Sequence, residues 1–129
     1  MKTRDELNAL SYKVIGAAME VHRTLGPGLL ESTYQQALLL ELQMQGLSVE
    51  SEKQIPFIYK GLIISAAYRA DIVVEDEIIV ELKATDKDNS LYSKQLYTYL
   101  KLAKKRLGLL INFNHEVLRD GIERIVNNF

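Results

Sequence analysis

The sequence predicts a mixed α/β fold in which helices flank a central mixed sheet. Three observations predict it. Apolar residues recur at three- and four-residue steps up to Gly46, and β-branched and aromatic residues dominate from 49 to 84. A further helical pattern then leads into the apolar run 109–113. The length of 129 residues is that of one ordinary domain, so we expect a single domain over residues 1–129.

Two amphipathic helices are expected first. One runs from Asp5 to Thr24 and is ended by Gly26-Pro27-Gly28, which favours a turn. The other begins near Leu29 and ends at about Gln45, before Gly46. The residues expected to face the core are Leu7, Leu10, Val14, Ala17, Ala18, Val21 and Leu25 in the first helix, and Leu30, Tyr34, Ala37, Leu38 and Leu42 in the second.

Three strands are expected next, over 49–59, 62–75 and 78–84, with a turn at Lys60-Gly61. We interpret them as an antiparallel meander. A third helix follows over 90–106, and Gly108 ends it. Its inward residues are expected to be Leu91, Leu96, Tyr99, Leu100 and Ala103.

The end of the chain is expected to complete the sheet. Residues Leu109 to Phe113 are an apolar run of the kind that makes a buried strand. Because a helix precedes this strand, we expect it to lie parallel to an earlier one. The segment from Val117 to Val126 is expected to form an edge hairpin around Asp120-Gly121.

The composition limits the chemistry that the chain can support. It contains no Cys, so any metal must be bound by carboxylates, carbonyls or the two His, a donor set that favours a hard cation. No apolar run approaches the roughly 20 residues of a membrane span. The residues after Met1 do not resemble a secretory signal, so we expect a cytoplasmic protein with no membrane partner. The net charge of -1 provides no overall attraction for nucleic acid.

The acidic stretch that begins at Asp71 carries the strongest chemical signal. If Glu75-Asp76-Glu77 is a three-residue connection between two strands, Asp71 faces Glu81. Alternation then puts Asp71, Glu81 and Lys83 on one face of the sheet. The opposite, apolar face is formed by Ile72, Val74, Ile78, Val80 and Leu82.

Two carboxylates placed directly opposite each other destabilise a sheet unless something compensates their charge. A bridging Mg²⁺ or Mn²⁺ would do so, with Lys83 free to orient or deprotonate a water or to stabilise charge on a phosphate. The alternative is that Lys83 forms salt bridges to Asp71 and Glu81 on a solvated face, with no metal and no reaction. The spacing alone leaves both interpretations open.

Two further polar residues are expected on inward positions. Gln95 lies at helical spacing between Tyr92 and Tyr99, where it could hold the attacking water or a substrate phosphate; the alternative is an amide at the helix border. Glu31 stands in the first turn of the second helix, where the helix dipole favours a carboxylate whatever its function. His22 could reach the site near Glu31 or simply cap its own helix.

Several spaced motifs resemble the GxxExxY protein family of the PD-(D/E)xK nuclease superfamily, over nearly the whole chain. The residues that carry the resemblance are Gly28-Leu-Leu-Glu31-Ser-Thr-Tyr34, Tyr68-Arg69-Ala70-Asp71, Val80-Glu81-Leu82-Lys83-Ala84, Gln95 with Tyr99-Leu100, and Gly108-Leu-Leu-Ile-Asn-Phe113. The resemblance implies a restriction-endonuclease-like αβββαβ core with an extra N-terminal helix. It implies Asp71 and Glu81 as metal ligands, Lys83 as the catalytic lysine, Gln95 as the polar residue on the helix and Glu31 as the acidic residue of the earlier helix. Ala70 stands where the superfamily motif often has proline.

The sequence therefore favours a nuclease that uses Mg²⁺ or Mn²⁺ and a water nucleophile to hydrolyse phosphodiester bonds of DNA or RNA. One alternative is a nucleic-acid-binding or protein-interaction module that keeps the fold without turnover, and another is a structural oligomer. A homodimer would join two half-sites. The basic residues of the third helix either form a solvated face or contact phosphates; they are Lys94, Lys101, Lys104, Lys105 and Arg106.

Overall fold

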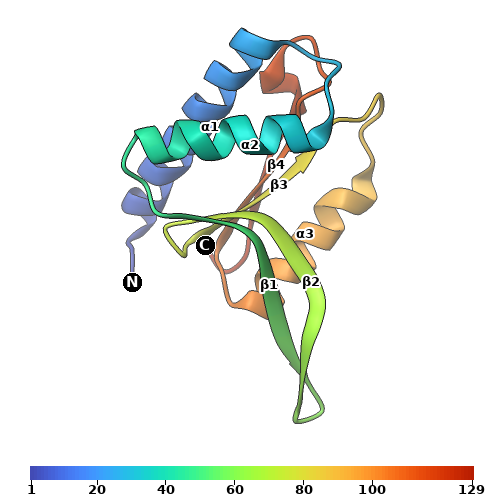
Figure 1. Cartoon of the computed structure of the whole chain (residues 1–129). Helices are drawn as coiled ribbons and strands as arrows, with labels where there is room; N and C mark the ends of the chain where they lie inside the picture. The colour runs from blue at the N-terminus through green and yellow to red at the C-terminus, as the bar shows by residue number, and fades with distance from the viewer.

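A five-stranded sheet lies between two helices on one face and a third helix on the other in the computed structural model of the protein (Figure 1). The structure describes residues 1–65 and 68–129. The elements, in chain order, are α1 (Arg4–Leu25), α2 (Glu31–Met44), β1 (Val49–Tyr59), β2 (Leu62–Val74), β3 (Ile78–Lys83), α3 (Ser90–Ala103), β4 (Leu107–Asn112), a 3₁₀ turn (Leu118–Gly121) and β5 (Ile122–Val126). The predicted mixed α/β class is confirmed, and the arrangement is that of a restriction-endonuclease-like fold.

The strands follow one another across the sheet in the order β1-β2-β3-β4-β5. Strands β1, β2 and β3 form the predicted antiparallel meander, and β4 pairs parallel to β3, as expected for a strand reached through a helix. The predicted hairpin register is confirmed, because Ile72 pairs with Val80 and Val74 pairs with Ile78.

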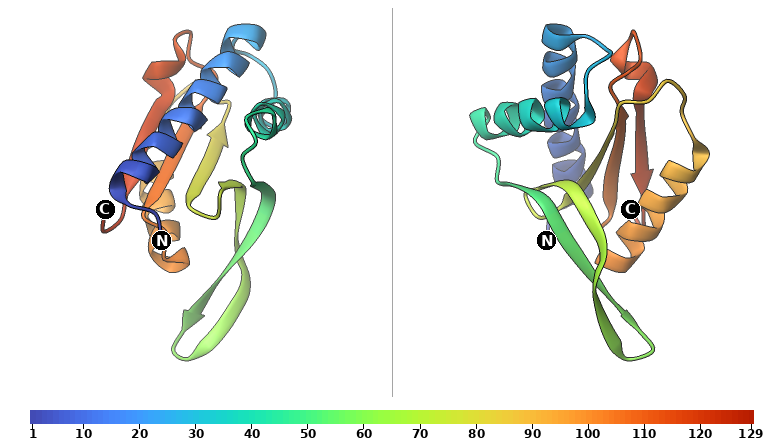
Figure 2. Two further views of the ribbon diagram at one scale, coloured as in Figure 1. Left: turned by 90° about the vertical axis from the view of Figure 1, so that its left-hand side faces the viewer. Right: turned by 45° about the vertical axis from the view of Figure 1, so that its right-hand side comes forward.

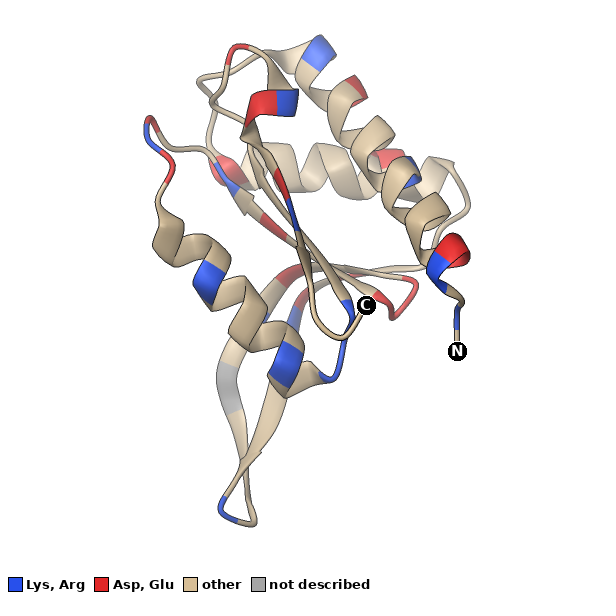
Figure 3. Ribbon diagram, turned by 180° about the vertical axis from the view of Figure 1, so that it is seen from behind, with Lys and Arg blue, Asp and Glu red and all other residues tan. Residues whose placement is uncertain are grey.

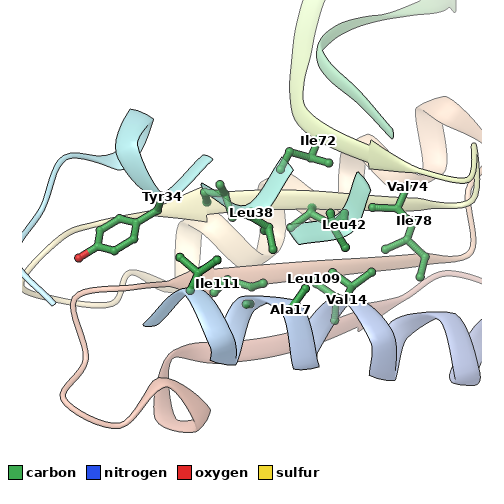
Figure 4. Packing of buried hydrophobic residues seen from close by; sticks show 14 of the residues in the cluster. Val14, Ala17, Tyr34, Leu38, Leu42, Ile72, Val74, Ile78, Leu109 and Ile111 are labelled. Carbon is green, nitrogen blue, oxygen red and sulfur yellow. The ribbon is translucent and has the colours of Figure 1, made fainter. Parts of the chain in front are cut away.

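The two faces of the sheet carry separate cores. Alternate residues of the central strands pack under α1 and α2, where the aromatic ring of Tyr34 and the side chains of Leu38 and Leu42 meet Ile72 and Ile111 (Figure 4). The intervening residues face α3 and form a smaller cluster. Its buried members are Ile55, Tyr68, Ala70, Val73, Ile79, Leu96, Leu100, Leu110 and Ile125. The side chains of Asp71, Glu81 and Lys83 therefore belong to the α3 face.

Local signals explain the ends of the helices. Thr3 and Glu6 form a capping box at the start of α1, and Asn89 caps α3 through its side chain. Leu25, Leu30 and Leu91, which we expected to face the core, are exposed. Leu25 is the last residue of α1, Leu30 directly precedes α2 and Leu91 is the second residue of α3, so each stands at the end of a helix. In the described part of the chain, no helix is long and apolar enough to cross a membrane.

Two predicted boundaries are wrong. Helix α3 ends at Ala103, because Lys104 adopts a left-handed conformation (φ 57°, ψ 40°) and stops it. Strand β4 consequently begins at Leu107, two residues before the predicted start. Gly108 lies inside the strand rather than ending the helix, and a Cβ there would lie 3.1 Å from the side chain of Leu96.

The last segment is not the expected edge hairpin. A 3₁₀ turn at Leu118–Gly121 leads into β5, which forms the sheet edge by pairing antiparallel with β4. At the other edge, the hairpin of β1 and β2 twists and extends away from the rest of the molecule (Figure 2).

Candidate active site

Asp71 and Glu81 meet on neighbouring strands, on the face of the sheet that α3 covers. The backbone N–H of Asp71 donates to Glu81 Oε1 at 3.3 Å, and the N–H of Leu82 donates to Asp71 Oδ2 at 2.8 Å. The hydroxyl of Tyr68 also donates to Glu81 Oε1. Each carboxylate is thus held by backbone groups of the opposite strand, and the two side chains share one patch as the register predicts.

The carboxylate pair carries negative charge that its surroundings do not fully compensate. Burial, followed by the negative charge of Asp71, raises the pKa of Glu81 to about 7, against the lowering effect of the Tyr68 hydrogen bond. Burial also raises the pKa of Asp71, opposed mainly by the hydrogen bond from Leu82. Two acids in one half-buried patch therefore favour a cation beside them.

Lys83 lies on the same face but does not neutralise the pair. Its Nζ is 4.3 Å from the centroid of the Tyr92 ring, a cation–π contact with α3. Its charge lowers the pKa values of Glu31, Asp71 and Glu81, so it stands near all three carboxylates. In the described residues it forms no ion pair with any of them. The salt-bridge arrangement considered above is therefore not the one that the structure contains.

Glu31 joins this patch from α2. It is the first residue of that helix and is half-buried; burial raises its pKa, and the charge of Asp71 raises it further. The turn before it is fixed by Tyr34, whose hydroxyl donates to Gly26 O at 2.6 Å and accepts from the N–H of Leu29 at 3.1 Å. The ring of Tyr34 stacks on Phe113 with centroids 4.5 Å apart. In the Gly-x-x-Glu-x-x-Tyr motif, the tyrosine therefore positions the glutamate.

The sequence analysis did not identify two neighbours of the site. Gln35 Nε2 donates to Glu52 Oε1 at 2.9 Å and to the carbonyl of Asp71 at 3.1 Å. The charge of Glu52 raises the pKa values of Asp71 and Glu31. Gln35 could have been found, because it lies one helical turn after Glu31. Glu52 could not, since its backbone takes a left-handed φ of 52° that interrupts the alternation of β1.

Gln95 does not lie on the expected inward position. Leu96 and Leu100 form the buried side of α3. Gln95, which directly precedes Leu96, is therefore turned toward solvent and is exposed. It makes no side-chain hydrogen bond within the described residues. Its helical neighbours do face the site: Tyr92 contacts Lys83, and Tyr99 stacks on Tyr68 with centroids 3.4 Å apart.

The two histidines lie outside the carboxylate patch. His22 Nε2 contacts the carbonyl of His115 at 2.7 Å, and His115 Nε2 lies 2.8 Å from Asp88 Oδ2. His22 therefore links α1 to the loop after β4 rather than reaching Glu31. A hollow of about 310 Å³ opens beside Lys83, between the start of α3, the end of β4 and the start of β5.

The donor set fits a hard divalent cation. The candidate ligands are all carboxylate oxygens, and Asp71 Oδ1 and Glu81 Oε2 accept no hydrogen bond from the described residues. Over residues 1–65 and 68–129, no three or more His, Cys, Asp or Glu side chains are already arranged around one metal position. Mg²⁺ usually binds through one or two carboxylates together with water and substrate phosphate, so two converging acids meet its requirements.

The sequence comparisons agree with this geometry. A family model described as PD-(D/E)XK nuclease superfamily matches residues 8–125, which is most of the chain. No curated protein and no solved structure matches.

Proposed function

The chain belongs to the PD-(D/E)XK nuclease superfamily, and from this premise we propose that it is a metal-dependent nuclease that hydrolyses phosphodiester bonds of DNA or RNA. We place it in the GxxExxY family on the motif from Gly28 to Tyr34. One observation carries the proposal. Asp71 and Glu81 form a half-buried pair with excess negative charge, and Lys83 stands beside the pair without neutralising it.

Asp71 and Glu81 are the proposed ligands of Mg²⁺ or Mn²⁺, and Glu31 adds a carboxylate through an intervening water. When bound, the cation would neutralise the pair and polarise the scissile phosphate. Lys83 Nζ orients the attacking water and donates hydrogen bonds to phosphate oxygens as negative charge develops on them. Because Tyr92 and not a carboxylate holds the ammonium group, Lys83 keeps its hydrogen bonds for the substrate.

Gln95 has the role of a substrate contact in this proposal. Its exposed position one helical turn from Tyr92 and Tyr99 suits an amide that meets a phosphate arriving from solvent. A homodimer would join two half-sites.

The proposal is tested by cleavage of labelled single-stranded DNA, duplex DNA and RNA in Mn²⁺ and in Mg²⁺. Wild type is expected to cut at least one of these substrates, and EDTA is expected to stop the reaction. Asp71→Asn and Lys83→Ala should each lower the rate by about 100-fold or more, because the first weakens metal binding and the second removes a positive charge from the reacting phosphate. Lys13→Ala, an exposed lysine on α1, is the matched control and should leave the rate unchanged.

Two results would contradict the proposal. One is full cleavage by a pure Lys83→Ala or Asp71→Asn preparation. The other is salt-dependent binding of nucleic acid without cleavage, unaffected by metal and by Lys83→Ala, which would identify the chain as a binding module with the nuclease fold.

A further inference from the structure

The outer half of the β1–β2 hairpin exposes a set of large apolar side chains. Tyr59 is 56% exposed, and Ile58, Leu62 and Ile63 are each at least 70% exposed. The turn between the strands is a tight two-residue turn in which Lys60 (φ 49°) and Gly61 (φ 80°) both have positive φ. The outer end of the hairpin extends beyond the rest of the fold (Figure 2). Because Ile58 pairs with Ile63 and Tyr59 pairs with Leu62, these side chains lie on both faces of the outer hairpin. Large apolar side chains exposed together on a folded chain usually mark a binding site.

The hairpin and the end of α3 together form a hollow of about 440 Å³. Its lining includes Phe57, Ile58 and Ile63 from the hairpin and Lys101, Leu102 and Lys104 from the end of α3. Two lysines of the hairpin and α3 form cation–π contacts with tyrosine rings. Lys60 Nζ is 5.5 Å from the Tyr59 ring centroid, and Lys101 Nζ is 5.0 Å from that of Tyr97.

The charge of this surface has one sign. The sequence has no Asp or Glu from 53 to 70 or from 89 to 115, the two segments that supply the hairpin and α3. In Figure 3, α3 and the outer part of the hairpin carry Lys and no acidic segments. Lys60, Lys101 and Lys104 form no ion pair within the described residues. A chain with a net charge of -1 thus concentrates unpaired positive charge beside exposed aromatic and aliphatic groups.

We propose that this surface, the outer hairpin with the end of α3, binds an unpaired nucleic-acid strand. Lysines would contact the phosphates, and the apolar and tyrosine side chains would contact the faces of the bases. A base buried in a duplex cannot make such contacts, so the surface favours single-stranded substrate. This inference rests on the proposed nuclease function for its biological sense, but the binding itself requires no metal.

The surface is continuous with the candidate active site. Ile63, at the hollow, and Asp71 are eight residues apart on the same strand, a distance of about 26 Å. Tyr68 lies between them, stacks on Tyr99 of α3 and donates to Glu81. A strand bound along the hairpin would therefore reach the carboxylate pair.

A second copy of the chain fits this surface less well. A symmetric pairing would bring Lys60, Lys101 and Lys104 of both copies into one interface, with no acid from either segment to compensate their charge. A phosphate backbone supplies the missing charge.

The test is fluorescence anisotropy in EDTA with a labelled single-stranded DNA of about 20 nucleotides, long enough to span hairpin and site. The matched duplex and the matched RNA strand are measured beside it. Lys101→Glu combined with Lys104→Glu should weaken binding about ten-fold and reduce the salt dependence of the affinity by about one to two phosphate contacts. Ile58→Ser combined with Ile63→Ser should weaken binding to a similar extent without changing the salt dependence.

Matched controls lie on the opposite face. Lys13→Glu on α1 and Leu40→Ser on α2 change an exposed lysine and an exposed leucine, and both should bind within about two-fold of wild type. Because EDTA prevents hydrolysis, the result is independent of the proposed reaction. Normal binding by the hairpin variants of an active nuclease would overturn this inference alone, whereas hairpin-dependent binding without metal-dependent cleavage would overturn only the proposed function.

Three further outcomes would overturn the inference. The first is the absence of binding to any of the three oligonucleotides by wild type. The second is tighter binding to the duplex than to the single strand. The third is a wild-type dimer, seen by analytical ultracentrifugation, that becomes a monomer when Ile58→Ser and Ile63→Ser are combined while the affinity for the oligonucleotide stays unchanged. That result would make the surface an interface between copies of the chain.

Discussion

Glu81 is the residue on which the electrostatics of the site depend most. Its carboxylate accepts hydrogen bonds from Tyr68 and from the backbone of Asp71, yet burial and the neighbouring acid still raise its pKa to about 7. The folded protein therefore holds a proton that the unfolded chain releases near pH 4.5. This difference couples folding to pH.

We expect the protein without metal to lose stability as the pH rises from about 5 to about 7.5. A raised carboxyl pKa favours the folded state only while the group stays protonated, so its contribution is present below the unfolded pKa and is lost through the folded one. The loss is at most about 3 kcal/mol. Thermal unfolding in EDTA at a series of pH values measures it.

Glu81→Gln should flatten this dependence and stabilise the protein at pH 8, because the amide keeps the acceptor for Tyr68 and removes the charge. Glu116→Gln, at an exposed position, is the matched control and should follow wild type. A Glu81→Gln variant with the wild-type pH profile would show that Glu81 is not the uncompensated acid.

Tyr34 gives a second prediction. Tyr34→Phe removes a hydroxyl that bonds to both Gly26 and Leu29, and the backbone groups of those two residues lose their partner. Unfolding in urea should show a loss of about 1–3 kcal/mol, whereas Tyr12→Phe, at a side chain that is 72% exposed, should cost less than about 0.5 kcal/mol. Equal effects of the two substitutions would show that the hydroxyl does not hold the turn before Glu31.

The hairpin of β2 and β3 could be derived from sequence because the length of its connection and the alternation of its apolar residues agree on one register. A connection of fixed length sets the register, and an apolar residue at every second position allows only one buried face. Asp71, Glu81 and Lys83 followed from that register without further information. Their roles in metal binding and hydrolysis remain predictions.

Helix α3 shows where such derivation fails. Its apolar residues predict an amphipathic helix but leave the rotation of the helix on the sheet uncertain by about one residue, or 100°. That rotation decides whether Gln95 or Leu96 is buried, and packing against Gly108 settles it for Leu96. The end of α3 depends on a left-handed Lys104, and the position of Glu52 on a left-handed residue within β1; propensity favours neither.

Gly121 tests how closely the 3₁₀ turn packs against β4, and Gly16 in α1 gives the opposite case of an unconstrained glycine. A Cβ on Gly121 would lie 2.3 Å from the carbonyl oxygen of Asn112, so Gly121→Ala should destabilise the protein by about 2 kcal/mol or more. Gly16 lies inside α1 with open space around it, and Gly16→Ala should stabilise by about 0.5–1 kcal/mol. Urea unfolding of both variants checks the pair; a tolerated Gly121→Ala would contradict the close approach of the 3₁₀ turn to β4.

The two faces of the sheet have different roles in this account: one holds most of the hydrophobic core, and the other holds the candidate site. The larger core lies under α1 and α2, while the α3 face carries the carboxylate pair, Lys83 and the positively charged hairpin surface. Substitutions at exposed positions of the α3 face should therefore alter binding or rate with little loss of stability. The fold and superfamily could be recognised from sequence because several spaced motifs are typical of them. The hairpin surface could not be predicted, because it is formed by segments that are distant in sequence and meet only in the folded chain.

Calorimetric titration of Mn²⁺, alone and with inorganic phosphate, tests the proposed site most directly because it requires no knowledge of the substrate. Wild type is expected to show saturable binding that is lost in Asp71→Ala and retained in Asp5→Ala, a change at an exposed acid on α1. Equal binding by wild type and Asp71→Ala, or no binding by wild type in either buffer, would contradict a metal site at Asp71 and Glu81.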